Sequence, residues 1–463
     1  MAEPDPAHVR DRSFWLDALD EPLTPRPHLP GDTEVDVAII GGGFTGLWTA
    51  YYLAVHQPDL RIMVLEREVV GFGASGRNGG WASGFIAGSA SVYTERSGAE
   101  AVLRAERATF DAIPEIGRVA AQERIDCGFT PDGTLTVAYS EPQRQRLLSG
   151  VAAKHARGIT EADVRLLAPA EIEPFVNTPG ALAASFSPHC ARIDPARLVR
   201  GLAVACERRG VVIHEGTAAL RQPGVVRTLF GRVTAPMIVL ATESYSVQAD
   251  GMGRRFLPLY SLMIATEPLG DDVWAEIGWR EGMTISDGHH LFFYAQRTAD
   301  GRLAIGGRGA PYRLGSPIDH AQEHNEAVRG RLIGSIQRHF PAAASAAITH
   351  HWGGPLAVPR DWCMSVTCDR HAGTAFSGGY SGHGVVAANL GGRTLADLIL
   401  ERESDLTTLP WVEHRPRTWE PEPLRYLASK AIVGVLGSAD RREDATGKRA
   451  RRTRLVAPFM MSR

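Results

Sequence analysis

A glycine-rich turn directly after a short apolar run is the feature that most constrains how this chain folds. Residues 35–40 read VDVAII, which is typical of a strand buried on both faces of a parallel sheet. The next residues, GGGFTG, give the G-x-G-x-x-G spacing at Gly41, Gly43 and Gly46. Three such glycines permit a tight turn, close approach of the backbone to a diphosphate, and close packing of a helix on the strand.

The residues that follow supply the context that this motif requires. FTGLWTAYYLAV, which starts at Phe44, has a helical apolar pattern, and a second apolar run, RIMVLE, ends at Glu66, twenty positions after Gly46. A carboxylate at this place accepts hydrogen bonds from ribose hydroxyls and disfavours a 2'-phosphate. The sequence therefore predicts a βαβ unit that binds an adenine dinucleotide without that extra phosphate.

The stretch GFGASGRNGG at residues 71–80 favours FAD over NAD. It contains five glycines, each of which costs conformational entropy on folding. A NAD-binding chain would normally continue into another helix here, whereas a glycine-rich loop lets the backbone lie against a second segment of the ligand, the flavin. A flexible surface linker is the alternative. However, Phe72, Arg77 and Trp81 interrupt the tract, and linkers usually lack such large side chains.

Length and hydrophobicity indicate a large globular protein. With 463 residues, 44% of them hydrophobic, the chain is long for one core and predicts two domains or one large composite. No apolar run approaches the roughly 18 residues of a membrane-spanning helix, and the N-terminus is acidic rather than basic and then apolar. We therefore expect neither a membrane span nor a secretory signal. The expected location is the cytoplasm.

Cysteine usage and charge exclude several kinds of site. The five cysteines are scattered, with no C-x-x-C pair, which predicts neither a disulfide framework nor a metal site. A net charge of −2 gives no reason to expect a nucleic-acid partner. We expect the basic residues 441–454 to form a poorly ordered, solvated tail. The oligomeric state stays open.

At GFGASGRNGG and at GGYSGHGVVAANLGGRTLADLI (378–399) the sequence resembles the D-amino-acid-oxidase-like flavoenzyme family, and within it the branch of bacterial gamma-glutamylputrescine oxidases. The resemblance runs from about Phe14 to Leu400 and includes ARIDPARL at 191–198, APMIVLAT at 235–242 and RTADGRLAIGG at 297–307. It implies an α/β fold, in which a Rossmann-like FAD-binding domain accompanies an α+β substrate domain built on a mixed sheet.

The resemblance also implies a division of the chain into segments. We expect an arm before and a tail after a discontinuous FAD-binding domain, into which the substrate domain is inserted. The expected segments are an N-terminal arm at 1–34, the FAD-binding domain at 35–90, 190–255 and 350–403, the substrate domain at 91–189 and 256–349 with a helix near 99–124, and a C-terminal tail at 404–463.

Family membership would assign the cofactor contacts to three glycine-bearing regions. The first turn would hold the diphosphate, Glu66 the adenosine ribose, Ala219 the adenine, and the loop at 71–80 the flavin side. GGYSGHG would end a strand and open a helix, whose N-terminal N–H groups can face the pyrimidine side of the flavin. The expected FAD-binding residues are Gly41, Gly43, Phe44, Thr45, Gly46, Glu66, Arg67, Gly73, Ala74, Ser75, Asn78, Gly79, Gly80, Ala219, Ala241, Gly379, Tyr380, Ser381, Gly382, His383 and Gly384.

Three side chains are candidates for catalysis. His383 would lie beside the isoalloxazine, where an imidazolium stabilises negative charge on the reduced ring; a structural histidine is the alternative. Tyr294 precedes a hairpin that would form a wall of the substrate site, although core packing would suit it equally well. Arg77 could bind a substrate carboxylate or the diphosphate, with an exposed arginine as the alternative. Arg308 and Arg297 are weaker candidates for carboxylate binding.

At two positions the sequence departs from the sarcosine-oxidase branch of the family, so the roles of those positions in that branch are not expected here. In the sarcosine-oxidase branch a lysine after the wall hairpin assists the reaction with oxygen, but Ala304 takes that place here. That branch also attaches FAD to a cysteine, whereas Cys363 and Cys368 lie too close to Tyr380 to match it. We therefore expect non-covalent FAD.

The predicted activity is FAD-dependent oxidation of a secondary amine or amino-acid-like amine, followed by imine hydrolysis and reoxidation by oxygen. A dehydrogenase that passes electrons to a carrier is the close alternative, because the lysine is missing. An FAD-containing RNA-modification or binding module, gripping phosphate through 441–454, is a third and less favoured class. No separate methyltransferase-like domain accompanies the fold, so we expect no nucleic-acid partner.

Overall fold

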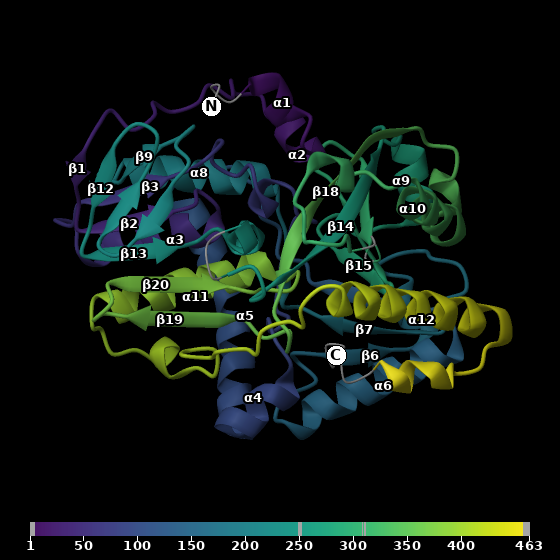
Figure 1. The fold of residues 1–463 in the computed structure, drawn as a ribbon. Helices are drawn as coiled ribbons and strands as arrows, with labels where there is room; N and C mark the ends of the chain where they lie inside the picture. The colour runs from purple at the N-terminus through teal and green to yellow at the C-terminus, as the bar shows by residue number, and fades with distance from the viewer. Residues whose placement is uncertain (1–4, 249–251, 308, 310–311, 457–463) are drawn as a thin grey trace.

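The structure is a computed structural model that describes residues 5–248, 252–307, 309 and 312–456. Two large sheets organise it (Figure 1). The first has six strands in the order β19-β20-β13-β2-β3-β9 and is parallel except between β19 and β20. The predicted unit at the glycine turn is confirmed as β2, α3 (Phe44–His56) and β3. The strands of this sheet are β2 (Val37–Ile40), β3 (Ile62–Leu65), β9 (Val212–His214), β13 (Met237–Leu240), β19 (Ser365–Asp369) and β20 (Thr374–Gly378).

Helices α3, α11 (Gly384–Ile399) and α8 (Pro195–Glu207) pack on the six-stranded sheet. A Cβ at Gly392 of α11 would lie 2.6 Å from Cβ of Trp48, so this glycine is what lets α11 approach α3 closely. The long helix α5 (Ala99–Gln122) belongs to the same core. We expected residues 99–124 in the substrate domain; the structure differs because the apolar stripe of α5 faces α11 rather than the second sheet.

The second sheet has eight strands in the order β18-β14-β17-β16-β15-β5-β7-β6. β15 and β5 run parallel and the other neighbours are antiparallel, so this sheet is mixed, as the fold class predicts. Helices α9 and α10 cover one of its faces (Figure 1). β18 lies mostly in the segment expected for the FAD-binding domain, yet it joins this sheet through β14. Its elements are β5 (Thr134–Ala138), β6 (Arg165–Leu167), β7 (Ala183–Ser187), β14 (Leu257–Thr266), β15 (Thr284–Asp287), β16 (Phe293–Arg297), β17 (Leu303–Gly307), β18 (Ile348–Val358), α9 (Asp271–Ile277) and α10 (Glu326–His339).

Smaller elements connect and flank the two large sheets, and β1, β12, β11 and β10 form a separate four-stranded sheet. The N-terminal arm forms two short helices, and a two-stranded pair of β4 and β8 continues the loop that starts at residue 71. These elements are α1 (Pro6–Arg10), α2 (Phe14–Asp17), β1 (Thr33–Glu34), η1 (Ala74–Gly76), β4 (Trp81–Ser83), α4 (Ala90–Ser97), α6 (Glu141–Ala156), α7 (Pro169–Ile172), β8 (Cys190–Arg192), β10 (Leu220–Gln222), β11 (Val225–Arg227), β12 (Arg232–Thr234), η2 (Glu243–Gln248), η3 (His320–Gln322), η4 (Pro341–Ala343) and η5 (Asp405–Thr408).

The C-terminal segment is more ordered than its composition suggested. Helix α12 (Leu424–Thr446) and η6 (Arg451–Leu455) replace the poorly ordered tail expected at 441–454. The reason is electrostatic, because three acids near the end of α12 find partners in the fold: Asp440 and Asp444 bind His290 and His289 in the loop before β16, and Glu443 binds Arg146 of α6. Among the described helices, none combines the length and the apolar character needed to cross a membrane.

Candidate cofactor and substrate site

A cavity of about 1900 Å³ lies between the two sheets. Ligand sites for drug-sized molecules occupy about 300–1,000 Å³, so this cavity can hold a dinucleotide together with a substrate. Nearly all of the predicted site residues line it; Gly46, Gly80 and Gly379 lie behind its wall. Those that line it are Gly41, Gly43, Phe44, Thr45, Glu66, Arg67, Gly73, Ala74, Ser75, Arg77, Asn78, Gly79, Ala219, Ala241, Tyr294, Tyr380, Ser381, Gly382, His383 and Gly384.

The first glycine turn has the geometry that a diphosphate site needs. Gly41 has φ +110°, which side-chain-bearing residues rarely adopt. A Cβ at Gly46 would lie 2.1 Å from the Gly41 carbonyl oxygen, so this glycine serves helix packing. Gly43 is the N-cap of α3, and the first N–H of that helix, at Phe44, donates to Ser75 Oγ at 2.9 Å. The positive end of α3 therefore opens on the cavity with Ser75 beside it.

Glu66 is held as a hydrogen-bond acceptor at the end of β3. Its Oε2 accepts from the Gly42 N–H at 2.7 Å and its Oε1 from the Glu68 N–H at 2.9 Å. Burial raises the pKa of the Glu66 carboxyl to about 6, against the effect of these two N–H donors. The carboxyl keeps lone pairs that can accept from ribose hydroxyls, as the sequence predicts.

The loop at 71–80 is built by its own side chains. Asn78 Nδ2 donates to the carbonyls of Ala74 and Ser75 at 3.2 and 3.0 Å, and its Oδ1 accepts from the Gly80 N–H at 2.9 Å. These bonds close the short turn η1 and fix the backbone that faces the cavity. The surface-linker alternative is thereby excluded, because these bonds give the loop a defined structure beside the cavity.

Several loop glycines are required by protein neighbours rather than by a ligand. A Cβ at Gly79 would lie 2.6 Å from the Tyr294 ring, one at Gly80 2.0 Å from Gln296, and one at Gly71 2.5 Å from Val199. Gly73 is different, since its nearest neighbour would be 3.5 Å away. The expectation that these glycines let the backbone lie against the flavin is therefore incomplete, because protein neighbours also require several of them. The loop is glycine-rich mainly because it lies pressed against β16 and α8.

Tyr380 connects the two glycine motifs. Its hydroxyl hydrogen-bonds to Thr45 Oγ1 at 2.8 Å and to Ser377 Oγ at 2.9 Å. Thr45 opens α3 and Tyr380 precedes α11, so this side chain brings the starts of both helices to the same cavity. Ser381 has φ +53° and donates to the Trp362 carbonyl at 3.1 Å.

Tyr294 and His383 both line the cavity. Tyr294 lies on β16, where alternation with the buried Phe293 and Ala295 turns it away from the core of the second sheet. Its hydroxyl shares a hydrogen bond of 2.9 Å with Ser261 Oγ. His383 is the N-cap of α11, and its ring lies 5.7 Å from the ring of Phe85.

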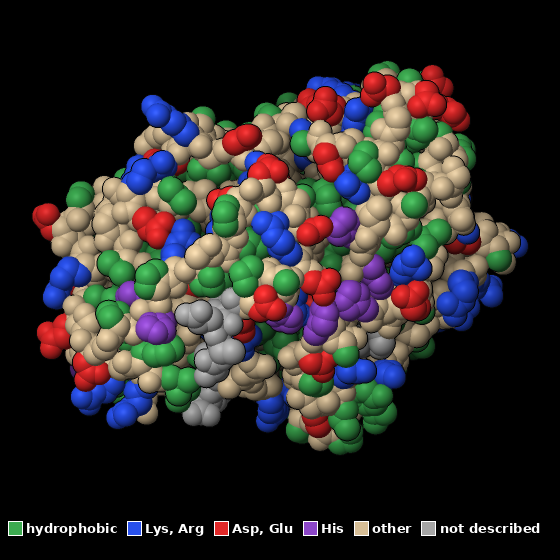
Figure 2. Space-filling model, turned by 90° about the horizontal axis from the view of Figure 1, so that it is seen from above, with side chains coloured by type: hydrophobic (Ala, Val, Ile, Leu, Met, Phe, Trp, Pro, Cys, Tyr) green, Lys and Arg blue, Asp and Glu red, His purple; other side chains and the backbone are tan. Residues whose placement is uncertain are grey.

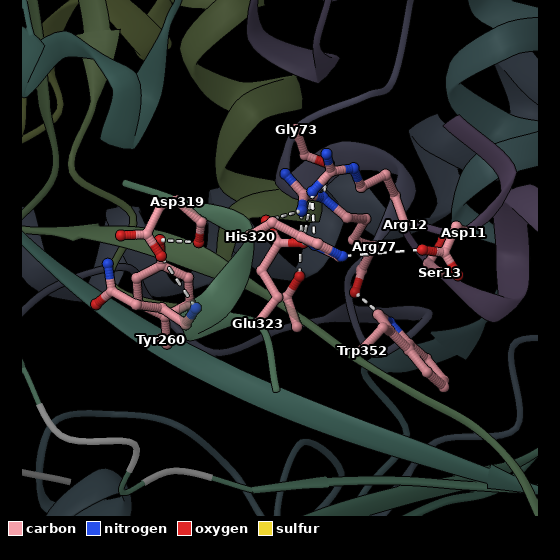
Figure 3. A network of polar contacts seen from close by, with 12 residues as sticks. Asp11, Arg12, Ser13, Gly73, Arg77, Tyr260, Asp319, His320, Glu323 and Trp352 are labelled. Atoms are coloured by element: carbon pink, nitrogen blue, oxygen red, sulfur yellow. Dashed lines mark hydrogen bonds and ion pairs between the residues drawn. The ribbon is translucent and has the colours of Figure 1, made fainter. Parts of the chain in front are cut away.

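The structure supports neither of the roles that the sequence suggested for Arg77, a ligand-binding side chain or an exposed arginine. Its side chain is fully buried, and Nη1 pairs with Glu323 Oε1 at 2.7 Å while Nη2 donates to the Tyr245 hydroxyl at 2.8 Å. Figure 3 shows this network, in which Arg12 of the N-terminal arm also reaches Glu323, at 3.1 Å. Trp352 Nε1 donates to the Arg77 carbonyl at 3.0 Å. The charge of Arg77 therefore holds the loop in place rather than awaiting a substrate carboxylate.

The weaker arginine candidates gain no support. Arg297 stacks over the Trp274 ring at 4.6 Å and does not line the cavity, and Arg308 lies outside the described residues. Ala304 is buried in β17 and also lies off the cavity. Cys363 is fully buried and Cys368 half-buried on β19.

Two clusters of potential metal ligands occur among the described residues. Their ligand atoms lie within 4.8 Å of one another in each case. Both clusters hydrogen-bond within the protein: His414 Nε2 pairs with Asp361 at 2.8 Å, and Asp440 accepts the backbone N–H of His290 at 2.9 Å. The two groups are Asp361, Cys363 and His414, and His290, Asp440 and Glu443.

Sequence reasoning missed three features of the cavity. Lys154 of α6 lines it, with Nζ 5.3 Å from the Phe85 ring centre, and the His383 ring lies 5.7 Å from the same ring. Glu243, the first residue of η2, also lines the cavity. Helix α12 adds a wall through Ser429, Ile432, Val433 and Leu436. The signals were weak: Lys154 is one of only three lysines, and an acid or an apolar helix has many ordinary roles.

Comparisons with known proteins agree with this geometry. The chain matches the family described as FAD dependent oxidoreductase over residues 36–398. It is 31% identical over 414 residues to a probable oxidoreductase, OrdL, of Rhizobium meliloti, covering 85% of this chain and 90% of that protein. It is 28% identical over 385 residues to gamma-glutamylputrescine oxidoreductase of Escherichia coli, covering 81% and 86%.

A solved structure shows the same fold. Glycine oxidase from Geobacillus kaustophilus superimposes with a TM-score of 0.67 and 19% identity, covering 82% of this chain and 99% of that chain. The resemblance drawn from the glycine motifs is thus confirmed. The chain belongs to the D-amino-acid-oxidase-like family of FAD-dependent oxidoreductases, which comprises enzymes of the amine and amino acid oxidase type.

Proposed function

We propose that this protein oxidises a secondary amine or an amino-acid-like amine, and that oxygen takes up the electrons to give hydrogen peroxide. The observation that carries the proposal is one cavity that joins the diphosphate turn, the loop at 71–80 and the wall residues Tyr294 and His383. The likeness to a gamma-glutamylputrescine oxidoreductase supports an amine as the substrate class.

FAD fits the residues that line the cavity, since a helix N-terminus, an acceptor carboxylate and a flat glycine-bearing loop meet there. Gly41, Gly43 and Ser75 would hold its diphosphate, and Glu66 its ribose. When bound, FAD supplies the acceptor for the hydride that leaves the carbon beside the amine nitrogen. The imine that remains adds water and separates into a carbonyl compound and a smaller amine.

The protein's part is to orient the amine and keep it neutral. The Tyr294 hydroxyl, held by Ser261, can accept from or donate to the amine nitrogen, and the packed ring fixes its position against Gly79. His383 at the start of α11 adds an imidazole to the positive end of the helix, where it can stabilise negative charge.

Lys154 gives the cavity a place for a substrate carboxylate. It lies on α6 and lines the cavity, with Nζ near the Phe85 ring that also neighbours His383, and an ammonium group binds carboxylates through charge-assisted hydrogen bonds. We infer that substrates with a carboxylate end bind toward α6, while the apolar residues of α12 accept a hydrocarbon chain.

One observation favours a dehydrogenase as the second candidate. By its resemblance to the sarcosine-oxidase branch, Ala304 would take the place of a lysine that assists the reaction with oxygen there, and Ala304 is buried and does not line the cavity. Within the described part of the chain, Lys154 is the one lysine that lines the cavity. Electrons could then pass to a carrier instead of oxygen.

An anaerobic titration separates these possibilities. Amines and amino acids with and without a carboxylate are added to the purified holoprotein while the flavin absorbance is followed, and oxygen is then admitted. Bleaching by one amine class, rapid recovery in oxygen and stoichiometric peroxide support the oxidase. A flavin that stays bleached in oxygen but recovers with an artificial electron acceptor supports the dehydrogenase, and no bleaching by any amine contradicts both.

A further inference from the structure

A row of hydroxyl side chains crosses the second sheet beside Tyr294. Thr136 of β5 lies directly opposite Ser185 of β7 on one side and Ser286 of β15 on the other, and Ser286 lies opposite Tyr294 of β16. This hydroxyl row, made of Ser185, Thr136 and Ser286, lines the cavity together with Tyr294. Neighbouring strands lie about 4.8 Å apart, so the distance from Tyr294 to the end of the row at β7 is roughly 14 Å.

The alternation of side chains along the strands directs the hydroxyl row into the cavity. Leu135 and Val137, on either side of Thr136, are fully buried in the hydrophobic core behind the sheet, and so is Ala184 beside Ser185. Successive side chains of a strand point to opposite faces. Thr136 and Ser185 are only half-buried although β5 and β7 are interior strands. Because both residues line the cavity, the surface that they keep faces it.

The next polar pair on the same face of the sheet is covered by protein. Thr284 and Gln296 are paired two residues along the strands from Ser286 and Tyr294. Both are buried and neither lines the cavity. Gln296 Nε2 donates to the Gly79 carbonyl at 2.6 Å, and Thr284 Oγ1 donates to a backbone carbonyl at 3.2 Å. The backbone therefore takes up the polar groups of that pair, whereas the hydroxyl row is left open to a ligand.

The protons of the hydroxyl row can be assigned from their partners. Ser286 Oγ donates to the Leu135 carbonyl at 3.4 Å, so Thr136 is the donor in the hydrogen bond of 3.0 Å between Thr136 Oγ1 and Ser286 Oγ. A hydroxyl group has one proton and two lone pairs. Thr136 Oγ1 therefore offers an acceptor to the cavity. Within the described residues no hydrogen bond occupies the Ser185 hydroxyl, which can donate or accept.

The packing of Tyr294 sets the direction in which a bound substrate extends. A Cβ at Gly306 of β17 would lie 2.4 Å from the Tyr294 side chain, whose hydroxyl hydrogen-bonds to Ser261 of β14. The tyrosine thus fills the face of the sheet over β17. On the other side of β16, over β15, β5 and β7, the small side chains of the hydroxyl row leave room. A substrate whose amine meets Tyr294 therefore extends toward β7, on which α6 packs.

We propose that Thr136 and Ser185 determine substrate specificity by binding a second polar group of the amine substrate, one that donates a hydrogen bond and is joined to the reacting amine by an aliphatic chain. The inference rests on the proposed amine oxidation and adds a second recognition point to it. An amine without such a group displaces water from Thr136 Oγ1 and leaves that acceptor unpaired, which is unfavourable. The donor is a hydroxyl, an amide N–H or a second ammonium group.

The test measures amine binding to the holoprotein by calorimetry, with the flavin reduced beforehand by dithionite so that no amine is turned over. The probes are hexylamine, aminohexanol and hexamethylenediamine, which share one chain and differ at its far end. The wild type should bind the two polar amines more tightly than hexylamine. Thr136→Val should weaken binding about 3- to 10-fold for aminohexanol and about 10- to 100-fold for the diamine. Hexylamine should bind as before, and the two polar probes distinguish a neutral from a charged donor.

Three further variants separate recognition from a general loss of structure. Thr136→Ser keeps the hydroxyl and should bind all probes like the wild type, whereas Ser185→Ala should weaken the polar amines alone. Thr367→Val is the matched control, because Thr367 is a half-buried strand threonine of β19 that does not line the cavity. It should change nothing.

Two results would overturn the assignment. One is that the wild type binds the three amines equally or binds none of them, and the other is that Thr136→Val weakens hexylamine as much as the polar amines or weakens none. The proposed function has a separate criterion, since it fails if no amine reduces the oxidised flavin. Binding to the reduced protein still decides on the hydroxyl row in that case.

Discussion

Tyr294 accounts for two glycines that lie far apart in the sequence. A Cβ at Gly79 would come within 2.6 Å of its ring, and one at Gly306 within 2.4 Å. Both glycines therefore make room for the tyrosine, which fills the junction between the loop at 71–80 and the second sheet. A side chain fixed on two sides in this way can present its hydroxyl to a substrate with little freedom to move.

Replacing Gly79 by alanine should therefore disturb the site. The added Cβ forces the Tyr294 ring or the loop to shift, at a cost of about 1–3 kcal/mol for overpacking. We expect a lower melting temperature and weaker FAD binding, measured on the same preparation. Gly334→Ala is the matched control, because nothing lies within 4 Å of its Cβ on the helix α10. The account is contradicted if Gly79→Ala behaves like that control.

Lys154 offers a second prediction for a single side chain. Lys154→Met should lower kcat/KM roughly 10- to 100-fold for amines with a carboxylate end, because a hydrogen bond to a charged group is worth about 1.5–3 kcal/mol. Amines without a carboxylate should be oxidised as before. Lys430→Met on α12 changes a lysine that does not line the cavity and should leave both classes unaffected. An equal loss for both classes in Lys154→Met would show that the lysine does not recognise the carboxylate.

At the scale of elements, two segments are fixed to the core by charged contacts. The N-terminal arm is joined to the loop at 71–80 through Glu323, which pairs with Arg77 at 2.7 Å and Arg12 at 3.1 Å. On the face seen from above, in Figure 2, acidic and basic side chains are interspersed, and several histidines gather right of the centre while others lie apart on the left. Helix α12 is joined to the loop before β16 through Asp440 and Asp444, and to α6 through Glu443. Both segments therefore depend on buried or half-buried charges.

Glu323→Gln tests the first of these contacts. The variant leaves two buried guanidinium groups side by side with one neutral partner, and breaking a buried ion pair in this way costs about 3–5 kcal/mol. We expect a large drop in the free energy of unfolding, together with faster proteolysis of the N-terminal arm. Glu326→Gln changes a neighbouring acid whose side chain is 81% exposed and should have little effect. Similar stabilities of the two variants would exclude a structural role for the network.

The contact between α12 and His289 predicts how stability depends on pH. The carboxylates of Asp287 and Asp444 hold the pKa of His289 at about 10, in spite of its burial. Because the pKa is raised in the folded state, the stabilising contribution is complete below about pH 6.5 and is lost as the pH rises through about 10.

Asp444→Asn removes one of these carboxylates. The fall in melting temperature with rising pH should then begin at lower pH than in the wild type, and α12 should exchange its amide hydrogens faster. Glu403→Gln, an exposed acid after α11, should follow the wild-type curve. Superimposable curves for Asp444→Asn and the wild type would show that His289 is not held charged by α12.

At the scale of the whole molecule, the sequence predicts the cofactor half better than the substrate half. The turn at Gly41, the acceptor Glu66 and the motif before α11 are local patterns, since neighbours in sequence shape the backbone that meets the ligand. The partner of Arg77 was not predictable, because Glu323 is brought to it only by the tertiary fold. Lys154 and the residues of α12 also line the cavity only because the tertiary fold brings them there, since both lie far in sequence from the glycine motifs.

Charge patterns misled most where a partner lay far away in sequence. The basic run at 441–454 suggested a solvated tail, but the acids Asp440, Glu443 and Asp444, just before and inside its start, anchor the segment to His290, Arg146 and His289. A run of like charge near a terminus is usually exposed. It becomes ordered here because the flanking acids find partners that only the fold supplies.

The visible spectrum of the purified protein, recorded before and after addition of an amine under anaerobic conditions, tests the central claim most directly. The account predicts a yellow protein that releases FAD on acid precipitation and whose flavin absorbance is bleached by one class of amine. A colourless protein that cannot be reconstituted with FAD, or a flavin that no amine reduces, would contradict it.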